Sequence, residues 1–237
     1  MRIDTTDNTK CCGCGACVVA CPQTCIRMMP DEEGFDYPVI DETTCIDCGR
    51  CLEVCGMQNE PQLHEVKETY AAWHKDLHIR ADSTSGGVFS ALADVTFADN
   101  GLVAGAAFTD DCKNVEHRLA SSWQEAKAFR GSKYVQSQTQ RCFSEIVRAL
   151  GDGKNVLFSG TPCQVASLCR LTGDPDNLKT CDIVCHGVPS SEIFKAYLRE
   201  LEQKNGSEVV SYEFRKKTYG WNFPKVVVGF KNGLVKS

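Results

Sequence analysis

Hydrophobic and polar positions alternate with two different periods beyond residue 69, and these periods predict strands and helices in turn. Short apolar runs predict buried strands at 102–108, 155–159 and 180–185. Apolar residues at helical spacing predict helices at 88–98, 140–150, 163–171 and 191–203. In the second of these helices Cys142 shares a face with Phe143 and Ile146, so we expect it in the core. Strands that alternate with helices favour an α/β domain with a mostly parallel or mixed sheet.

The end of the chain has a pattern typical of antiparallel strands. Alternating residues predict strands at 209–214 and 223–230, and Asn232-Gly233 is a strong signal for a type I′ hairpin turn. Only four residues follow this turn. We therefore expect the chain to be a piece of a longer protein, and these strands to be partly unpaired sheet edges, which favour aggregation.

The first 60 residues are dominated by cysteine spacing. A C-x2-C-x2-C-x3-C run starts at Cys11 and recurs, 34 residues later, from Cys45. The first three thiolates of such a run leave one tight loop and can hold one cubane, whereas the fourth lies a helical turn further on and faces the other cluster. The spacing therefore predicts two 4Fe–4S clusters, one on Cys11, Cys14, Cys17 and Cys55 and the other on Cys45, Cys48, Cys51 and Cys21.

Residues 8–60 resemble the bacterial two-4Fe–4S ferredoxins, which implies an α+β ferredoxin-like domain at 1–60, followed by a polar linker at 61–68. Pro22 follows Cys21 as in that family, whereas the second run has Gly56 in place of proline. Residues 34–40 predict the short strand between the two cluster loops. Two alternatives remain: structural zinc, which usually takes two separated cysteine pairs, and clusters with a structural role alone. Two further cysteines, Cys12 and Cys25, fall outside the spacing and are interpreted as small packed residues.

Composition narrows the function classes. The chain has 16 cysteines in 237 residues, but its start lacks the basic and apolar segments of a secretory signal, so a secreted disulfide protein is disfavoured. The formal net charge of −5 disfavours nucleic acid as a partner. No apolar stretch reaches the roughly 18 to 20 residues that a membrane helix needs. We expect no membrane span and a cytoplasmic location.

Three loops of the α/β region carry polar or sulfur groups next to predicted elements. Ser85-Gly86-Gly87 precedes the helix at 88–98 and presents N–H groups suited to a phosphate, although a glycine-supported helix cap is the simpler reading. Gly160-Thr161-Pro162-Cys163 joins a strand to a helix whose N-terminus would stabilise a thiolate. Cys185-His186-Gly187 follows the next predicted strand, so Cys185 is expected at a strand end beside Cys163. Taken singly, either cysteine is better interpreted as a buried small hydrophobe, but the two together favour a shared site. His186 is either a donor to the site or part of a capped turn.

The order of these motifs is similar to that of the coenzyme F-420 hydrogenase/dehydrogenase beta-subunit family. The resemblance rests on the cysteine runs and on four later segments: Ser85 to Leu92, Gly131 to Ser137, Gly160 to Gln164 and Cys185 to Pro189. It implies a flavin-binding α/β domain at 69–237 that exchanges hydride with a substrate and single electrons with iron–sulfur clusters. It also implies a third 4Fe–4S cluster on Cys163, Cys185 and a C-x2-C pair that this chain lacks.

The expected function is an FAD and iron–sulfur oxidoreductase that works with ferredoxin or another redox protein, and with partner oxidoreductase subunits, in an oxygen-poor cytoplasm. The alternative is a ferredoxin-type electron-transfer module without its own substrate. Flavin can exchange both hydride and single electrons, which is why it would be paired with clusters. The expected FAD-binding residues are Ser85, Gly86, Gly87, Lys133, Gly160 and Thr161. Lys133 could equally be a solvated lysine, and the sequence assigns no catalytic residue.

Overall fold

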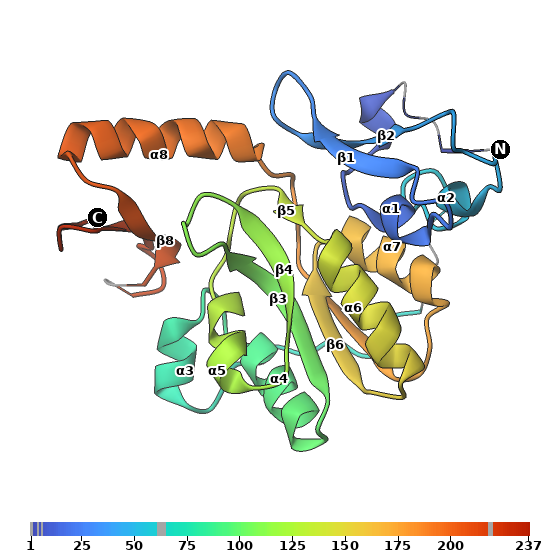
Figure 1. Cartoon of the computed structure of the whole chain (residues 1–237). Helices are drawn as coiled ribbons and strands as arrows, with labels where there is room; N and C mark the ends of the chain where they lie inside the picture. Colours follow the sequence, from blue (N-terminus) through green and yellow to red (C-terminus); the bar gives the residue numbers. More distant parts are fainter. Residues whose placement is uncertain (1, 4, 6, 61–64, 218–219) are drawn as a thin grey trace.

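The computed structural model describes residues 2–3, 5, 7–60, 65–217 and 220–237, so half of the expected linker at 61–68 lies outside the described residues. The cysteine-rich N-terminal region packs beside α6 and α7 of a larger α/β region, and a helix with a small sheet lies at the opposite end (Figure 1). No helix in these described ranges is both long and apolar enough to cross a membrane.

The N-terminal region has the ferredoxin-like arrangement that the sequence predicted. Strand β1 (Ile26–Pro30) pairs antiparallel with β2 (Asp36–Ile40), and three short helices hold the cysteine loops: η1 (Asn8–Lys10), α1 (Ala16–Ala20) and α2 (Arg50–Glu53). Helices α1 and α2 start directly after Gly15 and Gly49, whose φ angles are +71° and +83°. A side chain would be strained at such angles, so glycine allows each cysteine loop to turn into its helix.

The larger region is an α/β domain with a mixed five-stranded sheet, as expected. The strands are β3 (Leu102–Phe108), β4 (Val115–Ala120), β5 (Ser137–Gln138), β6 (Val156–Gly160) and β7 (Leu178–Asp182), in the order β5-β4-β3-β6-β7. The pair β3–β4 is antiparallel and the other neighbours are parallel. Strand β7 ends at Asp182, so the prediction that this strand reaches Cys185 is wrong. The sequence also missed β4 and β5, because neither is a continuous apolar run.

Helices cover both faces of this sheet, which explains the near-continuous apolar strands. On β6, Val156 and Phe158 face one side and Leu157 the other, and all three are buried. The first side packs under α6 (Gln140–Gly151) and α7 (Pro162–Thr172), and the second under α4 (Val88–Ala98), α5 (Trp123–Ala126) and η2 (Lys127–Phe129). Cys142 is fully buried in the first of these cores, as predicted from its helical face. A further helix, α3 (Leu77–Asp82), precedes α4.

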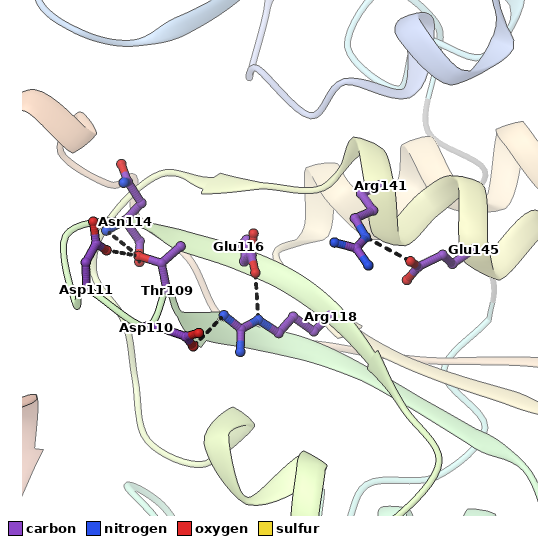
Figure 2. A network of polar contacts seen from close by, with 8 residues as sticks. All are labelled: Thr109, Asp110, Asp111, Asn114, Glu116, Arg118, Arg141 and Glu145. Atoms are coloured by element: carbon purple, nitrogen blue, oxygen red, sulfur yellow. Dashed lines mark hydrogen bonds and ion pairs between the residues drawn. The ribbon is translucent and has the colours of Figure 1, made fainter.

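Polar contacts hold the β3–β4 hairpin, the antiparallel part of the sheet (Figure 2). The Thr109 hydroxyl donates to the Asp111 carboxylate at 2.5 Å and accepts from the Asn114 N–H at 3.1 Å. On β4, Arg118 pairs with Glu116 at 2.6 Å and with Asp110 of the turn at 3.5 Å. Exposed pairs of this kind contribute little to stability. They fix the turn, and the buried residues of β4 fix its register.

The C-terminal end forms a second sheet in the order β10-β9-β8, from β8 (Val209–Lys216), β9 (Lys225–Phe230) and β10 (Val235–Lys236). The predicted Asn232-Gly233 hairpin joins β9 and β10. Strand β9 is the centre of this sheet, but β10 pairs only with its Val228 and Gly229, so β9 is partly unpaired on that side, as expected, and β8 lies at an edge. Helix α8 (Ser191–Asn205) packs on the sheet through Phe194, whose ring lies 5.1 Å from that of Tyr212 and 5.9 Å from that of Phe108 in β3.

Candidate metal centres and the adjoining α/β-domain site

The first cysteine run lines a hollow of about 390 Å³ that is open to solvent. Helix α1 and the loop before it supply three of the cysteines that the spacing assigns to one cluster, and the fourth comes from the end of the second run, after α2. These four, Cys11, Cys14, Cys17 and Cys55, share this hollow with Cys12. The fold therefore brings together the four residues that the spacing assigned to one cluster.

The second run lines a separate hollow of about 320 Å³. It is lined by Cys45, Cys48, Cys51 and, from the end of the first run, Cys21, together with Cys25. Cys48 is exposed, whereas Cys51 is buried. The crossed arrangement of fourth cysteines is thus present in both hollows.

Two observations test whether these residues fit cubanes or a single ion. Within the described ranges, no three cysteine, histidine or carboxylate side chains converge closely enough to hold one metal ion, whereas a structural zinc needs four ligands at about 2.0 to 2.3 Å. Backbone N–H groups point at the sulfurs, from Gly13 to Cys11 at 3.4 Å and from Ile3 to Cys51 at 3.5 Å. Such N–H···S bonds are typical of iron–sulfur sites. The residues fit two cubanes, which would supply one-electron transfer when bound.

Cys12 and Cys25, outside the spacing, both line the hollows. Cys25 is buried, as its interpretation as a packed residue requires, and its Sγ lies 3.3 Å from that of Cys21. The half-buried Cys12 thiol adjoins the sulfurs of Cys14 and Cys163, and this interaction lowers the pKa of both thiols. The first run and helix α7 therefore share a group of sulfur atoms.

The first cysteine loop docks on the α/β domain through polar and apolar contacts. The Ser167 hydroxyl of α7 lies 3.1 Å from Cys14 Sγ, and the Thr139 hydroxyl donates to the Cys14 carbonyl. Ala16 and Val54 are buried in the same core as α6 and α7. In the described parts of the chain no comparable polar contact joins residues 45–51 of the second loop to the α/β domain, whereas Gly56, after the end of the second run, donates its N–H to Ser167 at 3.3 Å. Only the first hollow adjoins that domain.

Four of the expected FAD residues, Ser85, Gly86, Gly87 and Lys133, lie on two loops that contact one another. Helix α4 begins directly after Gly87, and the nearby Thr84 hydroxyl accepts the Ser132 N–H at 3.0 Å. The Ser85 carbonyl accepts from the Lys217 ammonium at 3.3 Å, and the Gly86 carbonyl accepts the His74 N–H at 2.7 Å. The loops at 83–87 and 131–133 thus adjoin, and a cation stands beside the first of them.

Lys133 bonds backbone carbonyls and is not an extended surface lysine. Its ammonium donates to the carbonyls of Ala128 at 2.6 Å and Arg130 at 2.9 Å. The protein around this partly exposed lysine desolvates its ammonium, which lowers its pKa to about 7. A bound anion would restore the charged form of this lysine.

The structure adds His117, which the sequence analysis did not identify. The buried imidazole lies 3.2 Å from the Ser159 carbonyl through Nε2 and 3.1 Å from the Ser137 hydroxyl through Nδ1. A carbonyl only accepts, so Nε2 carries the proton. Ser137 in turn accepts from Gln164, whose side-chain oxygen accepts the Thr161 N–H at 2.9 Å. The signal was present in the sequence, because the alternation of 115–120 places His117 on the same face as Val115.

Burial, opposed by the Ser159 hydrogen bond and helped by the charge of Lys133, lowers the pKa of His117 to about 4. An unfolded histidine titrates near 6.5, so the unfolded state binds the proton first and stability is lost as pH falls from about 6.5 toward 4. Between pH 7.5 and 5.5 we expect the loss to be about 1 kcal/mol. Urea unfolding at the two pH values, in wild type and His117→Gln, checks this. The exposed His78→Gln variant is the control, and equal pH dependence in wild type and His117→Gln would contradict the assignment.

The β6–α7 turn places Cys163 as expected but only partly supports its pairing with Cys185. Thr161 caps α7 through a capping box with Gln164, and Cys163 lies in the first turn. Strands β6 and β7 end side by side, because Gly160 pairs with Asp182. Cys185, however, lies in the loop beyond β7, where its sulfur accepts the Gly187 N–H at 3.4 Å. The prediction that Cys185 ends the strand is therefore wrong.

Comparison with protein families explains this combination of a dicluster region and an α/β domain. A model of the 4Fe–4S dicluster domain matches residues 10–59. Models of the N-terminal and C-terminal parts of the coenzyme F420 hydrogenase/dehydrogenase beta subunit match residues 69–143 and 153–236. The chain belongs to the coenzyme F420 hydrogenase/dehydrogenase beta-subunit family. Its dicluster domain makes it an iron–sulfur electron-transfer member of that family.

Solved structures agree with this F420 hydrogenase/dehydrogenase beta-subunit fold. A chain of the F420-reducing NiFe hydrogenase complex from Methanosarcina barkeri matches with a TM-score of 0.50 and 19% sequence identity over 69% of this chain. At this identity the likeness concerns the fold. The chain spans 57% of the length of that hydrogenase chain. Among curated proteins no match was found.

Proposed function

We propose that this chain is an iron–sulfur flavoprotein oxidoreductase that passes electrons between two 4Fe–4S clusters and, through FAD, a substrate that gives or takes hydride. The proposed ligands are Cys11, Cys14, Cys17 and Cys55 for the first cluster and Cys45, Cys48, Cys51 and Cys21 for the second. Bound FAD would convert between two-electron and one-electron transfer. The residues of the chain bind these groups, orient them and keep the first cysteine loop beside the α/β domain.

One observation carries the proposal: the first cysteine loop packs against helix α7, whose N-terminus belongs to the expected flavin site. Ser167 contacts Cys14 at 3.1 Å, and Cys12 lies between Cys14 and Cys163. A ferredoxin domain that was only tethered to the α/β domain by a linker would not form this buried contact. These contacts place the first hollow next to the β6–α7 turn, and this proximity supports electron exchange within the chain.

The donors around the α/β loops suit a dinucleotide with a pyrophosphate. Helix α4 has 11 residues and no side chain caps its N-terminus, so its first N–H groups and its dipole favour an anion. The proposed FAD contacts are Ser85, Gly86, Gly87, Lys133, Gly160 and Thr161. Two further cations lie nearby: Lys217 bonds Ser85 of the loop at 83–87, and Arg130 donates to Ser90 in the first turn of α4 at 3.1 Å.

Lys133→Met is expected to weaken FAD binding by about 10- to 100-fold, because a hydrogen bond to a charged group is worth about 1.5 to 3 kcal/mol. Quenching of flavin fluorescence during an anaerobic titration with the protein measures the dissociation constant. Lys154→Met, at an exposed position, is the control and should bind as wild type does. Unchanged affinity in Lys133→Met would remove Lys133 from the site, and no binding to wild type would reject the flavoprotein proposal.

The alternative function is a ferredoxin-type module that serves a partner enzyme and has no substrate of its own. It predicts the clusters without flavin, so the same titration separates the two proposals.

In either case we propose a cytoplasmic, oxygen-poor setting, and a ferredoxin or partner oxidoreductase subunit that docks near the exposed Cys48. A third cluster on Cys163 and Cys185 stays a proposal for a chain that supplies further cysteines.

A further inference from the structure

Besides the thiol of Cys12, a side-chain group outside the four proposed ligands of each cluster places its polar atom against a ligand sulfur. Next to the first hollow it is the hydroxyl of Ser167, at 3.1 Å from Cys14 Sγ. In the second it is the thiol of Cys25, at 3.3 Å from Cys21 Sγ. The two groups have different origins, because Ser167 belongs to helix α7 of the α/β domain and Cys25 to the N-terminal domain itself.

The hydrogen bonds of Ser167 fix the direction of its hydroxyl. Ser167 is fully buried, and its oxygen accepts the backbone N–H of Gly56 at 3.3 Å. A cysteine that ligates iron is a thiolate, which can only accept. The hydroxyl hydrogen of Ser167 is therefore directed at Cys14.

Gly56 supplies an independent sign that this contact is built into the chain. It occupies the position where the ferredoxin pattern has proline. A Cβ atom at Gly56 would lie 2.8 Å from Ser167 Oγ and 3.1 Å from Ser167 N. Proline would also lack the N–H that Ser167 accepts. The departure from the ferredoxin pattern thus lies where α7 contacts the residue that follows Cys55, a proposed ligand of the first cluster.

We propose that Ser167 and Cys25 are positioning residues that set the reduction potentials of the first and second clusters respectively. Reduction adds one electron to a cluster, with no bond made or broken, and the added negative charge is spread over the ligand sulfurs. A hydrogen bond to such a sulfur stabilises the reduced form and raises the potential. A hydroxyl is a stronger donor than a thiol. Ser167 therefore raises the reduction potential of the first cluster more than Cys25 raises that of the second. Electrons are thereby favoured on the cluster beside the α/β domain. This inference rests on the proposed ligation of both clusters.

The test is an anaerobic redox titration of the reconstituted full chain, followed by electron paramagnetic resonance. Ser167→Ala is expected to lower the potential of one reduction step only, and Cys25→Ala to lower that of the other step only. Each shift should appear as a several-fold fall in the reduced-to-oxidised ratio at fixed potential, where a tenfold fall corresponds to about 59 mV. Ser144→Ala, an exposed serine of α6 that bonds only the Gln140 carbonyl among the contacts described here, should move neither step.

Ser167→Cys keeps a weaker donor at the same place and should shift the same step as Ser167→Ala by less, which tests the inference even if the alanine variant loses iron. Two results would overturn the inference. One is that both reduction steps keep their wild-type potentials in Ser167→Ala and in Cys25→Ala. The other is that both variants shift the potential of the same step. Wild-type protein that binds no reducible cluster would instead reject the proposed function from which the inference starts.

Discussion

Cys55→Ser is expected to remove the first cluster and leave the second, although Cys55 belongs to the second cysteine run. The iron content after reconstitution should fall from about eight atoms per chain to about four, since each cubane holds four. The reason is geometric: Cys55 lines the hollow of Cys11, Cys14 and Cys17, whereas Cys21 lines the hollow of the second run. Iron and acid-labile sulfide analysis measures the effect.

Double variants identify which cluster is lost. Adding Cys17→Ser to Cys55→Ser should cost no further iron, because both residues serve one cluster. Adding Cys51→Ser should remove the remaining iron. Cys181→Ser, at a cysteine of β7 remote from both hollows in sequence, is the matched control and should keep about eight irons. The crossed arrangement is contradicted if Cys55→Ser with Cys51→Ser retains about four irons.

Gly56→Ala is expected to lower the free energy of unfolding by about 2 to 4 kcal/mol. The new methyl group would overlap the Ser167 hydroxyl and crowd the α7 backbone, and overpacking of this kind costs about 1 to 3 kcal/mol. The displaced hydroxyl would also lose its bond from Gly56, which adds about 1 kcal/mol. Urea unfolding of the holoprotein, followed by circular dichroism, measures the change.

Gly151→Ala is the matched control, because a Cβ atom at Gly151 meets nothing within 4 Å. This residue ends helix α6, where alanine is favoured over glycine, so we expect no loss of stability. Gly56→Pro should lower the free energy of unfolding more than Gly56→Ala does, since proline also removes the N–H that Ser167 accepts. Wild-type stability in Gly56→Ala would mean that the close approach of Gly56 to Ser167 does not hold the domains together.

The parts of the fold that could be predicted are those where a sequence pattern is compatible with only one structure. The two cysteine runs specified the N-terminal fold and the crossed hollows, and continuous apolar runs located β3 and β6 because helices bury both of their faces. Strand β4 was missed because its outer face carries Glu116 and Arg118, and with it His117 was missed. Strand β7 was extended to Cys185 because Ile183 and Val184 are apolar, but both are exposed in the structure.

The contact between the domains could not be predicted, because it joins residues that are far apart in the sequence. Cys14 meets Ser167, and Cys12 meets Cys163, only after α7 has packed on α1. Neither Ser167 nor Cys12 belongs to a motif. The glycine at position 56 was a usable signal, because a departure from a ligand pattern at a position that is not a ligand indicates a packing requirement.

The most direct test of the account is the content of iron, acid-labile sulfide and FAD in the chain after anaerobic reconstitution. The account predicts about eight irons, about eight sulfides and about one FAD per chain. About eight irons with no FAD, at flavin concentrations that saturate known flavoproteins, would contradict the central claim and leave an electron-transfer module that serves another enzyme.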